Sequence, residues 1–360
     1  MVIAIAAAVV ITGGAAGAWF VWQGTDGDAE PDDDPAAGFA PPGEVVIRMP
    51  GADAGLADGV MITTPDGRSA DGGGAVVRSV QSGPVALSPT PNPTLVESGP
   101  YGPIPKVGAD GLRPFEEYAR PVAAPNGEEA VVAILIGGLG INQASTELAL
   151  SELPGAVSLA LAPYGSNLGA WAAQAREAGH ELFLQVPLEP FDFPVTDPGP
   201  HTLLADDPAA DNVDRLRWLM AQFTTYAGVV SYAGGRFLAD EEAMAGLVDE
   251  LAARGLMLVD EGAAAQSRAA EYSVGAVPFA AADLVIDREV DAAAIGSRLS
   301  QLEALALQRG YAIATASAFR VTIEQISQWA EGAAERGIRL VPITALANDP
   351  LVDATQVQIQ

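Results

Sequence analysis

The 360-residue chain has no cysteine and only two histidines, His180 and His201. The absence of cysteine excludes disulfide scaffolds, cysteine-ligated zinc, iron–sulfur clusters and thiol nucleophiles, and it is compatible with an oxidising compartment. Two imidazoles also exclude every mechanism that needs three. His180 follows a predicted helix and is expected to cap it, and His201 stands alone in a loop, so we expect no metal and no other cofactor.

Basic residues are also scarce. The chain has 18 Lys and Arg against 46 Asp and Glu, which gives a formal charge of −28 at pH 7. Such an acidic chain cannot replace the counterions around phosphates, and this argues against a nucleic-acid partner. Hydrophobic residues make up 49% of the chain. Because many of them are alanine, we expect a sizeable, helix-rich core built from small side chains.

The amino terminus is a long uncharged stretch, Val2–Trp22. At about 1.5 Å per residue, a helix of this length spans the ~30 Å hydrocarbon core of a bilayer. Trp19, Phe20 and Trp22 would lie at the membrane interface. We therefore expect residues 1–23 to form a membrane anchor and the rest of the chain to be exported to the periplasm or another extracytoplasmic space. The alternatives are a cleaved signal peptide, for which residues 16–18 (Ala-Gly-Ala) fit the cleavage pattern, and a buried helix.

Residues 24–128 read as an acidic linker rich in proline and glycine. No apolar period persists there, so the segment is predicted to be disordered and extended by its own charge. Near its end, residues 101–121 carry Leu112, Phe115 and Tyr118 at helix-like spacing, which indicates a short strap that docks onto the folded domain. Residues 349–360 are expected to be a C-terminal tail.

Residues 129–348 alternate between apolar strand-like runs and helical patterns. Strands buried on both faces and joined by helices require a parallel sheet. We predict an α/β fold with a distorted (β/α) barrel, an open doubly wound sheet being the alternative. The last helix is expected to open with a capping box formed by Thr322 and Gln325. The strands are expected at residues 130–136, 156–162, 181–186, 228–232, 256–260, 283–287, 311–316 and 339–343.

Ligand chemistry in such folds lies at the C-terminal ends of the strands. Glu189 and Asp260 are the candidate catalytic residues there, because two facing carboxylates serve as acid and base on a sugar when their pKa values differ. The same carboxylates could instead cap helices or pair with Arg236. The candidate substrate-binding residues at these ends are Gly137, Gly138, Gln185, Tyr232, Arg236, Asp287 and Ser317.

The first strand ends in the glycine-rich turn Gly137–Gly140. The turn lacks both the GxGxxG and the GK[ST] patterns, and no basic residue is near, so it does not predict a nucleotide site. A tight connection from strand to helix accounts for the glycines.

A series of motifs along residues 131–345 resembles the divergent polysaccharide deacetylase family. The resemblance implies a distorted β/α barrel of the glycoside hydrolase/deacetylase type and, commonly, an N-terminal membrane segment. The motifs are IGGLG (136–140), LPGAVSLALAPYG (153–165), AGHELFLQVPLEPF (178–191), GPHTLL (199–204), GVVSYAGGRF (228–237), RGLMLVDE (254–261) and YAIATAS (311–317).

The chain departs from the family pattern at its chemical centre. An Asp-Asp pair in the family corresponds here to Gly137 and Gly138, and a histidine corresponds to Gln185. Residues 231–235 replace an Asn-His-Met-Gly-Ser run, and residues 316–318 replace Gly-His-Pro. Deacetylation in the wider superfamily needs a metal, a carboxylate base and a histidine acid. The matching positions that remain are Gly140, Pro187, Glu189, Gly234, Arg236, Phe237, Asp260 and Asp287.

These substitutions predict a membrane-anchored pseudoenzyme of carbohydrate metabolism that recognises a cell-envelope glycan without metal-dependent deacetylation. Tyr232, Trp171 or Phe191 would then stack on sugar faces if they line the cleft. One alternative is a metal-independent glycan hydrolase that uses Glu189 and Asp260. Another is a non-catalytic interaction protein that binds a protein partner in the envelope.

Overall fold

The computed structural model describes residues 86–122 and 129–350. The predicted anchor over residues 1–23, the acidic part of the linker and the end of the tail lie outside these ranges. Within the described residues, no helix is both long enough and apolar enough to cross a membrane.

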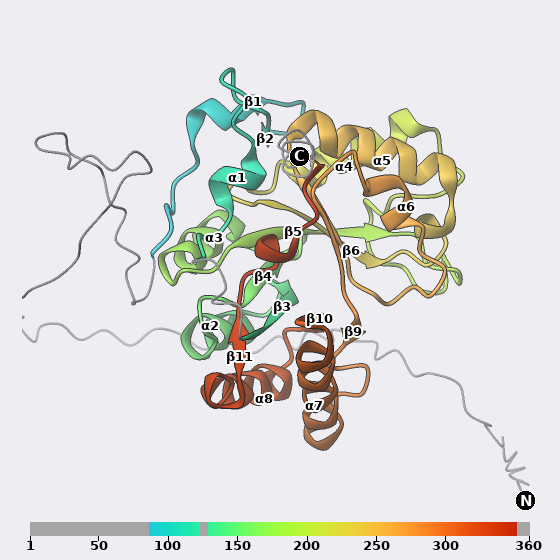
Figure 1. Ribbon diagram of the computed structural model, residues 1–360. Helices are drawn as coiled ribbons and strands as arrows, with labels where there is room; N and C mark the ends of the chain where they lie inside the picture. Colours follow the sequence, from blue (N-terminus) through green and yellow to red (C-terminus); the bar gives the residue numbers. More distant parts are fainter. Residues whose placement is uncertain (1–85, 123–128, 351–360) are drawn as a thin grey trace, which may run out of the picture. The chain divides into compact units, whose positions relative to one another are not determined.

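The centre of the fold is a sheet of parallel strands in the order β8-β7-β6-β5-β4-β3-β10-β9 (Figure 1). Only residues 282 and 283 separate β8 from β9, and these two strands pair with β7 and β10 respectively, so one stretch of chain connects the two edges of the sheet. The strands are β3 (Ala130–Leu139), β4 (Ser158–Leu161), β5 (Leu182–Leu188), β6 (Gly228–Ala233), β7 (Met257–Asp260), β8 (Phe279–Ala281), β9 (Leu284–Val285), β10 (Tyr311–Ser317) and β11 (Ile338–Leu340), which pairs with the start of β3.

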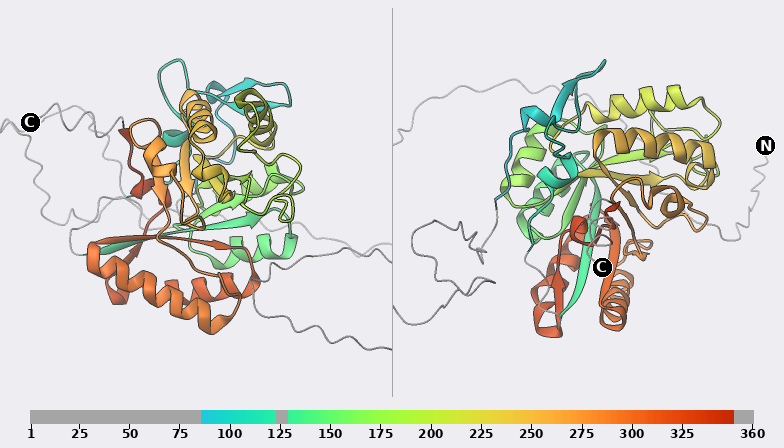
Figure 2. Two further views of the ribbon diagram at one scale, coloured as in Figure 1. Left: turned by 90° about the vertical axis from the view of Figure 1, so that its right-hand side faces the viewer. Right: turned by 45° about the horizontal axis from the view of Figure 1, so that its top comes forward.

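The sheet curls strongly, and the helices cover its outer face (Figure 2). This arrangement is consistent with the predicted distorted (β/α) barrel. Side chains cap the starts of α2, α5 and α7, and at α7 the Asp291 carboxylate accepts hydrogen bonds from two backbone N–H groups. The helices are α2 (Gln143–Glu152), α3 (Leu168–Glu177), α4 (Ala209–Met220), α5 (Glu241–Arg254), α6 (Ala269–Ser273), α7 (Ala292–Arg309) and α8 (Arg320–Glu331).

Alternate residues of each strand face the inside and the outside of the curled sheet. In β7, Met257 and Val259 pack in the inner cluster, whereas Leu258 packs in the outer cluster beneath the helices. In β5, Phe183 belongs to the inner cluster and Leu184 to the outer one. This alternation decides which side chains reach the inside of the barrel where the strands end.

Residues 86–122, which we call the strap, pack onto the barrel. The sequence analysis placed them in the linker and expected only residues 101–121 to dock. The strap contains β1 (Val96–Ser98), β2 (Pro103–Pro105) and α1 (Pro114–Tyr118), and β1 and β2 form an antiparallel pair. Phe115 and Tyr118 are buried in the inner cluster of the barrel. The helix-like spacing of these aromatic residues therefore marks the side of α1 that packs against the barrel.

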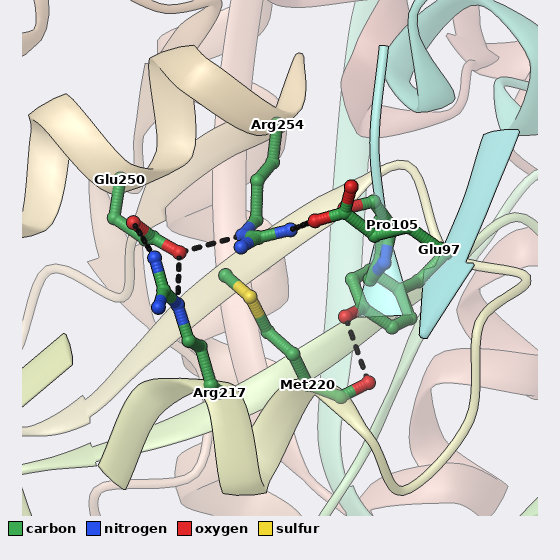
Figure 3. A network of polar contacts seen from close by, with 7 residues as sticks. Glu97, Pro105, Arg217, Met220, Glu250 and Arg254 are labelled. Atoms are coloured by element: carbon green, nitrogen blue, oxygen red, sulfur yellow. Dashed lines mark hydrogen bonds and ion pairs between the residues drawn. The ribbon is translucent and has the colours of Figure 1, made fainter. Parts of the chain in front are cut away.

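Buried charges attach the strap to α4 and α5 (Figure 3). The Arg254 guanidinium donates to Glu250 at 2.6 Å and to the backbone carbonyl of Pro105 at 2.7 Å, and it also contacts Glu97 at 3.1 Å. Arg217 contacts the same Glu250 carboxylate through both oxygens, at 2.9 and 3.2 Å. The helix pair and the strap thus share one network of ions.

The sequence prediction is wrong at the start of the last helix. Helix α8 begins at Arg320, and Phe319 at its N-cap makes no side-chain cap. The Thr322 hydroxyl donates instead to the Asp287 carboxylate at 3.1 Å. Thr322 therefore joins the helix to the end of the neighbouring strand and is not the first residue of a capping box.

Candidate functional site

A pocket opens where the strands end, on the side that we call the mouth of the barrel. It encloses about 350 Å³, including space open to solvent. Most of its lining comes from residues that continue the inward alternation of their strands. The lining residues are Leu135, Gly137, Gln185, Val230, Ser231, Tyr232, Glu261, Val285, Thr315, Ala316 and Ser317, and we call this set the mouth pocket.

Gly137, Gly138 and Gln185 form one unit on one side of the mouth pocket. The Gln185 side-chain oxygen accepts a hydrogen bond from the Gly138 N–H at 3.0 Å. A Cβ atom on Gly137 would lie 3.1 Å from the Gln185 amide nitrogen, so the glutamine fills the space next to this glycine. Gly138 has a φ of +81°, a conformation that favours glycine. Backbone and amide groups therefore occupy this part of the pocket.

Glu261 is the carboxyl group of the mouth pocket. Burial raises its pKa from 4.5 to about 8, and the neighbouring Asp260 carboxylate acts in the same direction. The Ala233 N–H and Arg288 act against this shift without cancelling it. At neutral pH the Glu261 side chain is therefore mostly protonated, and it offers a ligand one O–H donor in addition to acceptor oxygen.

The backbone around Glu261 is also fixed by hydrogen bonds. The Glu261 N–H donates to the Ser231 hydroxyl oxygen at 2.9 Å, and the Thr315 hydroxyl donates to the Glu261 carbonyl at 2.6 Å. These bonds connect the ends of β6, β7 and β10. The carboxyl group is consequently presented by a rigid frame of three strands.

Tyr232 lies at the edge of the mouth pocket, with 45% of its surface exposed. The next residue, Ala233, has a φ of +60°, which costs a non-glycine residue roughly 1–2 kcal/mol. Partial burial and the nearby Glu261 raise the pKa of the Tyr232 hydroxyl, so the phenol stays neutral. Strained backbone thus places an aromatic ring and a neutral hydroxyl at the entrance.

Glu189 and Arg236, two further candidates, hold two loops together beside the mouth. The Glu189 carboxylate is buried, pairs with the Arg236 guanidinium and accepts a hydrogen bond from the Ala205 N–H at 2.7 Å. Arg236 also pairs with Asp206. Neither Glu189 nor Arg236 is among the residues of the mouth pocket. Both oxygens of Glu189 are engaged in these contacts.

Asp260 and Asp287 are buried at the ends of their strands and lie outside the mouth pocket. The Asp260 carboxylate accepts from the Gly262 N–H at 3.0 Å and thereby shapes the turn after β7. The Asp287 carboxylate accepts from the Ser317 N–H at 2.8 Å, and its burial raises its pKa. Ser317 itself lines the pocket. The structure therefore does not bring Glu189 and Asp260 together with the other predicted residues in this pocket.

The two histidines and Trp171 are packed elsewhere. His180 is fully buried, its Nδ1 lies 2.8 Å from the Val157 carbonyl oxygen, and burial lowers its pKa. His201 stacks on Trp218 with 3.7 Å between the ring centroids. Trp171 lies on α3 and packs against the outer cluster. All three rings pack against other parts of the fold, and none of them lines the mouth pocket.

Residues 134–347 match the sequence profile of the divergent polysaccharide deacetylases. The chain belongs to the divergent polysaccharide deacetylase family. A solved structure of an uncharacterized protein from Agrobacterium tumefaciens C58 is similar to it, with 46% sequence identity and a TM-score of 0.65, over 68% of this chain and 99% of that one. No curated protein matches the chain significantly. Membership in the family implies a carbohydrate-related function.

The metal centre used in the wider deacetylase superfamily does not fit this member of the divergent polysaccharide deacetylase family. Within residues 86–122 and 129–350, no three His, Asp or Glu side chains are grouped closely enough to hold an ion. Glycine, glutamine, serine and tyrosine occupy the corresponding positions, and the one carboxyl group in the mouth pocket is mostly protonated at neutral pH. A divalent cation prefers deprotonated carboxylates and imidazoles. The residues at the mouth therefore do not fit a catalytic metal ion.

Glu261 follows the predicted strand 256–260 directly and is a candidate position for that reason, but the sequence analysis selected Asp260 in its place. The signal was the strand alternation of LMLVDE: Met257 and Val259 face inward, so Glu261 continues the inward side and Asp260 the outward side. The sequence analysis chose Asp260, the last residue of the predicted strand, but its side chain faces the outside of the sheet and cannot line the pocket.

Proposed function

We propose that this member of the divergent polysaccharide deacetylase family is membrane-anchored and exported, recognises a cell-envelope glycan through its mouth pocket, and lacks metal-dependent deacetylase activity. One observation carries the proposal: the pocket is lined by neutral hydrogen-bonding groups where a metal enzyme needs charged ligands. Amide, hydroxyl and protonated carboxyl groups complement the hydroxyls of a sugar, since each such group donates or accepts without a charge to neutralise.

Tyr232 supports a saccharide ligand specifically. A sugar ring has apolar C–H faces and polar edges, and a half-exposed phenol matches both features. Its ring is placed at the entrance by the strained Ala233 backbone, and such strain concentrates at functional sites. The mouth pocket would then hold the polar edge of one sugar unit while Tyr232 covers its face.

The same groups argue against hydrolysis as the main activity. A protonated Glu261 does not deprotonate water at neutral pH. Glu189 is occupied by Arg236 and the Ala205 N–H, so its pairing with Asp260 as acid and base would require these contacts to break. Glycan recognition needs no such rearrangement.

Calorimetric titration of the full-length protein with chito-oligosaccharides tests the proposal. We expect saturable binding that persists in chelator, without release of acetate, and a loss of about tenfold in affinity for Tyr232→Ala. Tyr311→Ala is the matched control, because Tyr311 is 46% exposed and begins β10 at the opposite end of the barrel. Acetate release that requires a metal would contradict the proposal, and so would binding to a protein partner without any binding to glycan.

The anchor is tested separately by cell fractionation. The full-length protein is expected in the membrane fraction with its barrel accessible to protease added outside the cytoplasmic membrane. A variant that lacks residues 2–22 is expected to remain in the cytoplasm. Recovery of the full-length protein as a processed form in the periplasm would instead identify residues 1–23 as a cleaved signal.

A further inference from the structure

A second hollow lies at the ends of strands that also line the mouth pocket. About 330 Å³ of it is accessible to water, which lies at the lower end of the range of about 300–1,000 Å³ typical of small-molecule sites. Its lining residues are Pro190, Phe191, Asp192, Ala233, Gly235, Ala263, Ala264 and Ala265, and we call this set the outer groove.

The outer groove and the mouth pocket share the ends of two strands. Tyr232 lines the pocket and the next residue, Ala233, lines the groove. After β7, Glu261 lines the pocket and Ala263 lines the groove. The two hollows are therefore consecutive along the mouth, so a ligand longer than one sugar unit would extend from the first into the second.

Phe191 is the distinctive side chain of the outer groove. The residue is 63% exposed, although burial of a phenylalanine side chain is favourable. The ring nevertheless has a defined seat, because a Cβ atom built on Gly235 would lie 2.7 Å from its Cδ2 and 2.8 Å from its Cε2. The ring edge that carries Cδ2 and Cε2 thus lies next to Gly235, where no side chain intervenes, and the residue stays largely exposed to a ligand.

The remaining lining of the groove favours an uncharged ligand. Three consecutive alanines leave an apolar wall, and Asp192 is the one charged residue of the lining. The Asp192 carboxylate accepts from the Thr196 hydroxyl at 2.7 Å and retains further acceptor capacity. A negative carboxylate in a chain with a formal charge of −28 disfavours an anionic ligand and accepts hydrogen bonds from neutral hydroxyls.

We propose that the outer groove binds a second sugar unit of an uncharged oligosaccharide, with Phe191 as its stacking platform and Gly235 as the residue that positions the ring. This inference rests on the proposed function and deepens it: the protein selects glycan chains over single sugars. Tyr232 contributes to every ligand, whereas Phe191 contributes only to ligands of two or more units.

The test is calorimetric titration of the full-length protein with N-acetylglucosamine and its β-1,4-linked dimer, trimer and tetramer. We expect affinity to rise about tenfold from the monomer to the longer oligomers. Phe191→Ala should abolish this rise and leave monomer binding unchanged, and Phe191→Trp should retain it. Gly235→Ala should weaken the rise while the aromatic ring is still present, since its methyl group displaces the ring. Tyr311→Ala should bind like the parent protein.

The outcomes separate this inference from the proposed function. If the parent protein binds oligosaccharides and Phe191→Ala retains the full dependence on chain length, the outer groove is not the second subsite and the proposed function stands. An equal loss of affinity for all lengths would also overturn the inference, because it would place Phe191 in the first subsite. If the parent protein binds no saccharide of any length, the proposed function and the inference fail together.

Discussion

The two ends of the barrel differ in how they use charge. At the N-terminal end, the strap covers the strands, and arginines and glutamates such as Arg254, Arg176 and Glu181 are buried with partners. Glu181 accepts from the Ser158 hydroxyl at 2.7 Å and from the Thr344 hydroxyl at 2.6 Å. At the mouth, the polar groups that line the pocket come from glutamine, serine, threonine and tyrosine and from one carboxyl group, beside glycine and apolar residues.

The difference indicates what each end does. Buried charges with fixed partners hold segments that are distant in sequence, and removing one partner leaves the other unsatisfied. Neutral groups at an open end remain free to exchange water for a ligand. The N-terminal end is therefore structural, although part of the family motif AGHELFLQVPLEPF lies there. At the other end, buried charges such as Glu189 lie beside the mouth pocket and do not line it.

The largest effect is expected at the structural end, for Arg254→Ala. This change removes the contacts to Glu250, Glu97 and the Pro105 carbonyl, and it should lower the free energy of unfolding by about 3 kcal/mol. Chemical denaturation measures it. The matched control is Arg268→Ala, because the Arg268–Glu271 pair is exposed to solvent and should contribute far less to stability. If the two changes lowered the free energy of unfolding equally, the buried Arg254 network would contribute no more than an exposed ion pair, and the comparison would fail.

A smaller effect is expected at Glu261, as a dependence of stability on pH. The raised pKa means that the folded state holds a proton that the unfolded state has lost, so this stabilisation is complete below pH 4.5 and declines as pH rises through about 8. Because the side chain is partly exposed, we expect the parent protein to lose about 2 kcal/mol relative to Glu261→Gln over this interval. Denaturation curves at several pH values measure the difference.

The control for this pH dependence is Glu331→Gln, an exposed glutamate on α8. The free energy of unfolding of Glu331→Gln should change with pH in the same way as that of the parent protein. Glycan affinity of the parent should also decline above pH 8, as the O–H donor of Glu261 is lost, and the Glu261→Gln variant should be flat. If the free energy of unfolding of the parent protein changed with pH in the same way as that of Glu261→Gln, burial would not raise the pKa of Glu261, and this account of the mouth would be wrong.

The smallest effects concern two glycines. Gly138→Ala should destabilise the protein by about 1 kcal/mol, because a φ of +81° strains any residue with a Cβ atom even though space is free around it. Gly169→Ala lies inside helix α3, also with free space, and should stabilise the protein by about 1 kcal/mol. Thermal denaturation of both variants checks the opposite signs. A neutral Gly138→Ala would mean that the mouth tolerates a side chain such as the aspartate of the family pattern.

Much of the barrel could be predicted from sequence, because long apolar runs and helix caps are local signals. Strand β10, Tyr311–Ser317, covers the predicted strand 311–316 and extends it by one residue. Strand β8 and helix α6 were not predicted, since three and five residues are too short for a period to be recognised. The start of α8 was predicted wrongly because Thr322 bonds to Asp287, a residue distant in sequence.

The candidate site was predicted less completely. Strand ends indicated Gly137, Gln185, Tyr232 and Ser317, which all line the mouth pocket. The positions of Glu189 and Arg236 depend on a loop that brings Ala205 and Asp206 to them, and no local pattern encodes that approach. The raised pKa of Glu261 results from three-dimensional burial, which composition and spacing do not reveal.

The most direct measurement of the central claim, that the mouth binds glycan with neutral groups in place of a metal, is a titration of the full-length protein with chitotriose at pH 7, with and without chelator. We predict the same dissociation constant in both conditions and no acetate in the products. Binding or acetate release that disappears in chelator and returns with added zinc would contradict this account.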